Sequence, residues 1–163
     1  MTDHESPTVL FPPQRRYVRY FVCARSWLFS CIFRNGDATN RAESANIPDI
    51  GPLPPGRYYI LLRGLGGWYT QTKDSVNAFF TGSNRNEWFA LYRDDGLIND
   101  ETFVKGVRRG EFRLHPIGPS GISKGCITLY SQSDFKILAS ALLRTGGQQL
   151  GNYMIAHGVV QVY

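Results

Sequence analysis

The dense spacing of glycine and proline constrains this chain most strongly. Its 163 residues include 17 glycines and 9 prolines, which divide the apolar residues into short runs separated by turns. Short apolar runs between turns favour strands over long helices, so the sequence predicts a mostly β fold. With 42% hydrophobic and 13% aromatic residues, the chain suits one compact domain with a real core.

Several of the apolar runs have the composition of strands. Residues 17–23 and 27–33 carry aromatic and β-branched side chains on either side of a short break, which predicts a hairpin. Asp94 and Asp95 stand before a glycine, a pattern typical of a tight turn rather than of paired catalytic carboxylates. Further strands are predicted at residues 57–63, 68–72, 88–92, 111–115, 127–130 and 159–163.

One segment, residues 132–144, has the pattern of a helix. Ser131 can cap its N-terminus, and Asp134 stands three residues later, as in a capping box. The apolar side chains recur on one face, which predicts packing against a sheet. These side chains are Phe135, Leu138 and Leu142, with Ile137 and Ala141 beside them.

The chain is expected to hold a loose arm and one domain. Residues 1–14 are polar and contain prolines, which indicates the arm, and residues 15–163 form the domain. Residues 17–33 are apolar in patches, but arginines interrupt them, so no membrane span is expected. They also lack a signal-peptide cleavage pattern, so we expect synthesis in the cytoplasm without a signal peptide.

The net charge of +5 sets bounds on the partners of the chain. A basic surface favours anionic envelope polymers or an acidic protein partner, or simply solubility. Neither an RNA-binding signature nor a Cys/His zinc spacing accompanies the charge, so nucleic acid is not expected as a partner. Without a Cys/His zinc spacing we expect no metal site, and no cofactor is expected.

The three cysteines are an odd number, so a disulfide framework cannot include all of them. Cys23 and Cys31 stand inside apolar runs and are expected to be ordinary structural residues. Cys126 differs because it follows Gly125, opens an apolar run, and lies downstream of His115 at the end of a strand-like run. A buried thiol and a satisfied histidine are the simplest alternative for the last two residues.

Together these residues have the chemistry of an acyl-transfer site. An imidazole near a thiol can take its proton and return it to a leaving group, so we expect His115 to lower the pKa of Cys126. Gly125 allows a tight turn and leaves room for a substrate carbonyl beside the sulfur. The backbone amides of Gly125 and Cys126 are the candidates for an oxyanion hole.

Two motifs resemble those of a known family. His115 followed by Ser123-Lys124-Gly125-Cys126 resembles the His…Ser-x-Gly-Cys signature of L,D-transpeptidases, the YkuD-like peptidoglycan enzymes. Residues 51–58, Gly-Pro-Leu-Pro-Pro-Gly-Arg-Tyr, resemble a segment of small L,D-transpeptidase effectors that type VI secretion delivers. The two motifs together span about half of the chain, and the pair is far more specific than Ser-x-Gly-Cys alone.

The resemblance implies a YkuD-like β-sandwich with one α-helix packed after the strand of the catalytic cysteine. It also implies that Cys126 attacks the diaminopimelate carbonyl of a peptidoglycan tetrapeptide stem, releasing D-alanine and leaving a thioester. A second stem, a free D-amino acid or water then resolves the thioester, giving a crosslink, an exchanged stem or a tripeptide. His115 serves as base and then as acid.

Further residues take roles from the same resemblance. The backbone carbonyl of Pro116 would orient the imidazole. Ser123 would shape the loop or hydrogen-bond the substrate or His115, although a local turn hydrogen bond is an equal alternative.

The sequence departs from many L,D-transpeptidases at two positions. Lys124 stands where they have a second histidine, and Thr128 stands where they have an arginine that is often assigned to a substrate carboxylate. Arg113 and Lys124 are the candidate substrate-binding residues here, and a purely structural role for Arg113 is the alternative.

As an effector, the protein would use the type VI secretion machinery, act in the periplasm of a target cell, and be neutralised by an immunity protein over the Cys126 cleft. Two other functions compete with this one: a non-catalytic module that binds peptidoglycan or a partner, and a cysteine peptidoglycan amidase.

Overall fold

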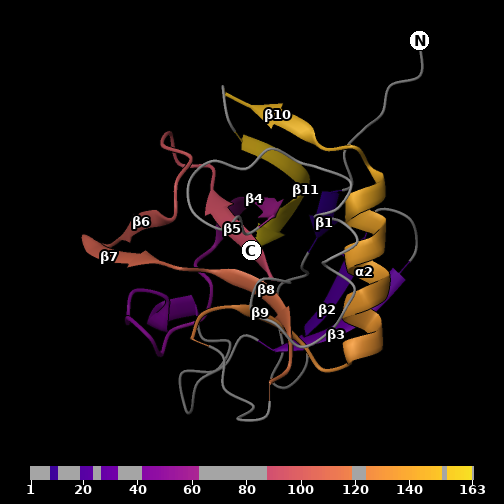
Figure 1. The fold of residues 1–163 in the computed structure, drawn as a ribbon. Helices are drawn as coiled ribbons and strands as arrows, with labels where there is room; N and C mark the ends of the chain where they lie inside the picture. The colour runs from indigo at the N-terminus through magenta and orange to yellow at the C-terminus, as the bar shows by residue number, and fades with distance from the viewer. Residues whose placement is uncertain are drawn as a thin grey trace.

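The computed structural model describes residues 8–10, 19–23, 27–32, 42–62, 88–118, 124–151 and 154–162. Within these ranges the chain forms a body of strands with one α-helix along its side (Figure 1). The helices are the short 3-10 helix η2 (Ala42–Ser44) and the α-helix α2 (Gln132–Arg144). The strands are β1 (Thr8–Leu10), β2 (Arg19–Cys23), β3 (Trp27–Ile32), β4 (Gly56–Leu62), β5 (Phe89–Arg93), β6 (Glu101–Val104), β7 (Val107–Gly110), β8 (Arg113–Pro116), β9 (Ile127–Leu129), β10 (Gln148–Leu150) and β11 (Met154–Val162).

The main sheet has nine strands in the order β1-β2-β3-β9-β8-β5-β4-β11-β10, and β1 also pairs with β11. The sheet therefore closes on itself through β1. Neighbouring strands of the main sheet are antiparallel except for the pairs β8–β9 and β1–β11, which are parallel. β6 and β7 form a separate two-stranded sheet. This mostly β architecture with one packed helix confirms the predicted fold class and is consistent with a β-sandwich.

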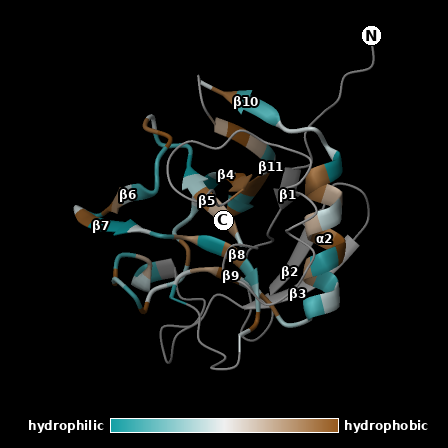
Figure 2. Ribbon diagram, in the orientation of Figure 1, coloured by the Kyte–Doolittle hydropathy of each residue, from teal (hydrophilic) through white to brown (hydrophobic). Residues whose placement is uncertain are grey.

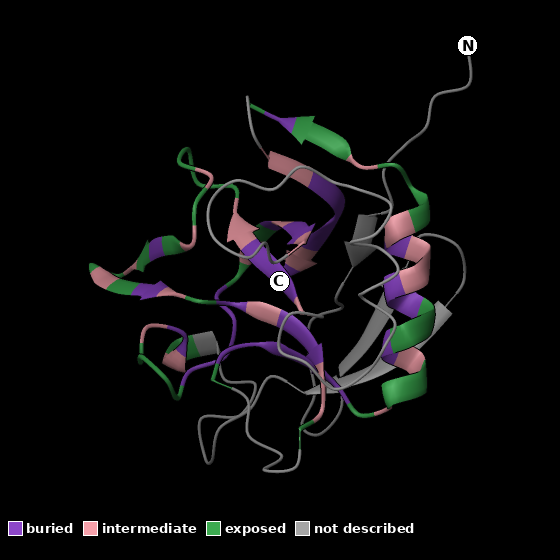
Figure 3. Cartoon of the chain, viewed as in Figure 1, coloured by how far each residue is buried: buried purple, intermediate pink, exposed green. Residues whose placement is uncertain are grey.

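The core lies between the sheet and α2. Strands β5, β9 and β11 are largely buried, and α2 packs against β8, β9 and β11 with its buried residues (Figure 3). Hydrophilic residues alternate with apolar ones along α2, as expected for a helix with one core face (Figure 2). The core side chains include Tyr58, Ile60, Phe89, Leu91, Leu114, Ile127, Leu129, Phe135, Leu138 and Leu142.

The predicted helix is confirmed from its first residue to its last. Ser131 accepts a hydrogen bond from the backbone N–H of Asp134, at 3.2 Å, which satisfies one of the donors that the first turn leaves open. Phe135, Leu138 and Leu142 are buried against the sheet, whereas Ile137 is exposed. The core face therefore follows the 3.6-residue period of the sequence.

A side-chain hydrogen bond fixes residues 51–58 where they enter the sheet. The buried hydroxyl of Tyr58 donates a hydrogen bond to the carbonyl oxygen of Pro54, at 2.8 Å. Pro54 and the neighbouring prolines hold the chain extended, and Gly56 then begins β4. At the start of this segment, the carbonyl oxygen of Gly51 lies against Gly125, next to Cys126.

Other expectations need correction. Residues 8–10 were assigned to the loose arm, but they form β1 between β2 and β11. The last strand begins at Met154 rather than at residue 159. The β6–β7 hairpin was not predicted, because its turn is a Lys105-Gly106 pair with φ of 51° and 78°, outside the usual turn signals.

One further prediction is confirmed, and others concern features that the described residues do not test. The hairpin predicted from residues 17–33 is confirmed as β2 and β3. The strand predicted at residues 68–72 lies outside the described residues, and the boundary at residue 15 stays a prediction. No helix among the described ranges has the length and apolar character needed to cross a membrane.

Candidate active site

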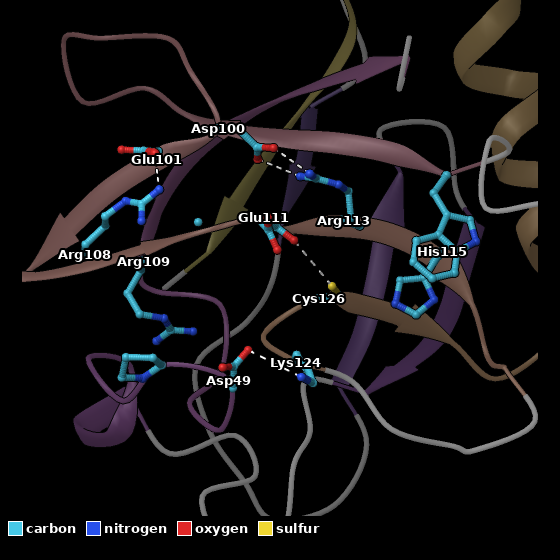
Figure 4. Close-up of a pocket in the computed structure, with 13 residues that line it drawn as sticks. Asp49, Asp100, Glu101, Arg108, Arg109, Glu111, Arg113, His115, Lys124 and Cys126 are labelled. Atoms are coloured by element: carbon cyan, nitrogen blue, oxygen red, sulfur yellow. Dashed lines mark hydrogen bonds and ion pairs between the residues drawn. The ribbon is translucent and has the colours of Figure 1, made fainter. Parts of the chain in front are cut away.

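The parallel pairing of β8 and β9 brings the predicted histidine and cysteine to one side of the sheet. Leu114 pairs with Ile127, and His115 pairs with Thr128. Because Leu114 and Ile127 face the core, their neighbours His115, Thr128 and Cys126 face the other way. His115 and Cys126 both line a pocket of about 880 Å³ (Figure 4).

The imidazole of His115 is held on three sides. Its Nδ1 lies 2.8 Å from the carbonyl oxygen of Pro116, and its Nε2 lies 3.2 Å from Oγ1 of Thr128. The indole of Trp88 stacks on the ring, with centroids 4.2 Å apart and planes 19° apart. A carbonyl can only accept, so in the neutral ring Nδ1 carries the hydrogen and Nε2 offers its lone pair.

Cys126 is 7% exposed, and its thiol donates to the backbone carbonyl of Glu111, with 3.9 Å between sulfur and oxygen. Burial raises the pKa of this thiol, and Arg113 offsets only part of that rise. Burial likewise lowers the pKa of His115, which is 5% exposed. The expectation of a lowered thiol pKa is therefore wrong for the resting site, where thiol and imidazole are both neutral.

The turn before Cys126 depends on Arg109, a residue that belongs to neither sequence motif. Its buried guanidinium donates to the carbonyl oxygens of Ala45 and Gly51, the second at 3.1 Å, and lies 5.3 Å from the ring centroid of Phe112. Gly125 fits against this group with φ +81°, and a Cβ there would lie 2.9 Å from Nη2 of Arg109. The glycine is therefore required by backbone conformation and by space.

No sequence signal would have identified Arg109. Its hydrogen-bond partners are main-chain carbonyls about 60 residues earlier, and carbonyls leave no trace in residue identity. The neighbouring Arg108 carries the same charge but is exposed and pairs with Glu101. The two arginines differ because side chains alternate along β7, so that Arg108 points to solvent and Arg109 into the protein.

The two predicted substrate-binding residues lie on the pocket wall, and both have acidic partners. Arg113 forms a bidentate ion pair with Asp100, at 2.6 and 2.5 Å. Burial opposes the charge of Arg113, but this pair outweighs burial and raises its pKa. Lys124 lies 3.7 Å from Asp49, and these side chains are 66% and 73% exposed. Ser123 lies outside the described residues, and all of these roles stay predictions.

The pocket carries balanced charge. Its four basic residues are Arg108, Arg109, Arg113 and Lys124, and its four acidic residues are Asp49, Asp100, Glu101 and Glu111. Such a pocket suits a ligand with both ammonium and carboxylate groups better than a polyanion. Among the residues that the structure describes, no three His, Cys, Asp or Glu side chains gather as a metal site would require.

Comparison with protein families matches residues 34–152 to the Tlde1 domain. The match covers most of the chain and includes both motifs, His115 and Cys126. The chain belongs to the Tlde1 domain family. This is the type VI secretion L,D-transpeptidase effector family that the motifs resemble. Comparison with curated proteins finds no match.

Replacing Gly125 tests the turn, and Gly106 provides a matched control. Both glycines have left-handed φ, +81° and +78°, but nothing lies within 4 Å of a Cβ added at Gly106. Gly106→Ala should lower the free energy of unfolding by about 1–2 kcal/mol, the conformational cost alone. Gly125→Ala must also displace Arg109, so its loss should be larger by about 1–3 kcal/mol in urea unfolding. Equal losses in the two variants would show that Arg109 does not constrain the turn.

The pH dependence of thiol alkylation tests the neutral resting pair. Only the thiolate reacts, so a raised pKa means that Cys126 alkylation should still increase above pH ~8.5, the ordinary thiol value. Peptide mass spectrometry after a pulse of iodoacetamide measures Cys126 separately from the other cysteines. Full reactivity of Cys126 below pH ~7, lost in His115→Ala, would instead show a thiolate–imidazolium pair.

Proposed function

We propose that this protein is a cysteine acyl-transferase that acts on peptidoglycan tetrapeptide stems, by L,D-transpeptidation, D-amino acid exchange or L,D-carboxypeptidase cleavage. One observation carries the proposal: the parallel β8–β9 pair places Cys126 and His115 on one face and in one pocket. Membership of the Tlde1 domain family supports the reaction class.

The geometry of His115 supports a general-base mechanism. Nδ1 is held by Pro116, so Nε2 is the nitrogen that can take the thiol proton. As Sγ of Cys126 bonds to the diaminopimelate carbonyl carbon, its proton moves to Nε2 and the carbonyl oxygen becomes an oxyanion. When the oxyanion reforms the carbonyl, the C–N bond to D-alanine breaks and its nitrogen takes the proton, leaving a thioester on Cys126.

The second half of the reaction reverses these roles. An amine or a water attacks the thioester carbon, His115 takes its proton, and the carbonyl oxygen again becomes an oxyanion. As the carbonyl reforms, the C–S bond breaks and the sulfur takes the proton back from His115. An amine acceptor gives a crosslink or an exchanged stem, and water gives a tripeptide. The choice of acceptor therefore depends on which nucleophile enters the pocket.

Backbone amides of Gly125 and Cys126 are our candidates for binding the oxyanion. Their support comes from Arg109, whose guanidinium lies against Gly125 and bonds to the carbonyl oxygen of Gly51. A turn fixed in this way can present N–H groups without reorganising during the reaction.

Lys124 is a better candidate than Arg113 for binding the substrate carboxylate. Arg113 is committed to Asp100 by two short hydrogen bonds and is largely buried. The exposed pair of Lys124 and Asp49 is weakly held, because water screens both charges. A substrate that carries an ammonium and a carboxylate can therefore separate this pair and bind to both partners.

We further propose that the protein acts in the periplasm of a target cell after delivery by the type VI secretion machinery, with an immunity protein as its inhibitor. Family membership supports this route. Expression with an added signal peptide should be toxic to the host cell, and expression in the cytoplasm should not. Equal toxicity from both compartments would place the substrate in the cytoplasm.

Mass spectrometry of purified muropeptides after incubation with the protein tests the reaction itself. The wild type should remove D-alanine from tetrapeptide stems or exchange it for an added D-amino acid. Cys126→Ala should lose all turnover, and His115→Ala should lose about 100- to 10,000-fold, the usual contribution of general acid–base catalysis. Circular dichroism should show both variants folded.

Cys23→Ser and Cys31→Ser provide the matched controls and should retain turnover. Cleavage elsewhere in the stem by the wild type would identify an amidase. Unchanged muropeptides would identify a binding module. Turnover by Cys126→Ala at the wild-type rate would exclude the cysteine as nucleophile.

A further inference from the structure

Thr128 is a polar residue in a buried position that the reaction scheme above does not use. It is 2% exposed, and its Oγ1 lies 3.2 Å from Nε2 of His115. It stands two residues after Cys126, where the sequence analysis noted an arginine in many L,D-transpeptidases. The arginine is often assigned to a substrate carboxylate, whereas Thr128 contacts His115 inside the site.

The pairing of β8 with β9 places Thr128 beside His115. In the parallel register Thr128 is the direct partner of His115. Ile127 and Leu129 on either side of it belong to the core, so Thr128 shares the opposite face with Cys126. The hydroxyl is thus built into the same two strands as the base and the nucleophile.

A hydroxyl suits both protonation states of the imidazole. When Nε2 is neutral, the hydroxyl donates a hydrogen bond to its single lone pair, and this bond has to break before Nε2 takes the thiol proton. When Nε2 carries the proton taken from the thiol, the hydroxyl rotates and its oxygen accepts from the new N–H. A buried charged group without a partner is costly, so this second bond matters most while His115 is an imidazolium.

The ring has few other ways to stay in place. Pro116 fixes Nδ1 in both states, and Trp88 covers one face without restraining rotation within the ring plane. Among the described residues, Thr128 is the one that contacts the Nε2 edge of the ring. Losing it would leave the N–H of the imidazolium without this acceptor.

We propose that Thr128 is a positioning residue that orients Nε2 of His115 and stabilises the imidazolium formed when the Cys126 thiol is deprotonated. The proposal rests on the proposed function for its kinetic consequence. Its structural part, a hydrogen bond that favours protonated His115, concerns the free protein and can be measured without substrate.

Thr128→Val tests the proposal because it keeps the shape and removes the hydroxyl, and Thr128→Ser is the matched control that keeps the hydroxyl. In the muropeptide assay Thr128→Val should lower kcat by about 10- to 100-fold, the loss expected for one hydrogen bond to a charged group, with KM little changed. Thr128→Ser should stay close to wild type. Unchanged kcat in folded Thr128→Val, or a loss in folded Thr128→Ser as large as that expected for Thr128→Val, would overturn the proposal.

A titration of His115 by ¹⁵N NMR supplies a readout that does not depend on activity. Thr128→Val should lower the pKa of His115 below that of the wild type, because the imidazolium loses an acceptor, and should shift the Nε2 resonance of the neutral ring. Thr128→Ser should restore both. An unchanged titration in Thr128→Val would overturn the proposal that Thr128 hydrogen-bonds to Nε2. This result does not depend on turnover, whereas a wild type that turns over no muropeptide would reject the proposed function.

Discussion

The buried guanidinium of Arg109 is the interaction on which the candidate site depends. It donates hydrogen bonds to the carbonyl oxygens of Ala45 and Gly51, stacks on Phe112, and leaves at Gly125 a space that admits only a hydrogen atom. Three distant parts of the chain therefore meet at one side chain: residues 45–51, the β7 strand and the turn before Cys126. A buried cation is tolerated because oriented carbonyl dipoles replace its lost water. The path of residues 45–51 and the shape of the turn before Cys126 both depend on this contact.

Burial also sets the protonation of the pair. The same desolvation raises the pKa of Cys126 and lowers that of His115, so neither carries charge before substrate binds. A neutral thiol is less exposed to adventitious alkylation and oxidation than a thiolate, since reactivity follows thiolate character. The proton then has to move as the sulfur attacks, which makes the orientation of the imidazole decisive. Pro116, Trp88 and Thr128 restrain the ring on different sides, and each belongs to or adjoins a strand of the main sheet.

Local patterns in the sequence predicted much of this architecture. Helix α2 was found because its cap at Ser131 and its apolar period both lie within one short segment, and Cys126 and His115 were found because they match a motif. What could not be predicted depends on contacts between distant segments. The strand β1 pairs with β11 at the other end of the chain, Arg109 needs main-chain carbonyls, and the role of Thr128 needs the register of two parallel strands. The raised thiol pKa was missed for the same reason, because burial is a property of the assembled fold.

The central claim is that Cys126 carries the acyl group, and mass spectrometry of the intact protein measures this directly. After brief incubation with tetrapeptide stems and an acid quench, the wild type should gain the mass of a tripeptide acyl group. Digestion should place that group on the peptide that contains Cys126, and hydroxylamine should remove it, as expected for a thioester. An adduct on a different residue, or release of D-alanine by the Cys126→Ala variant, would contradict the claim.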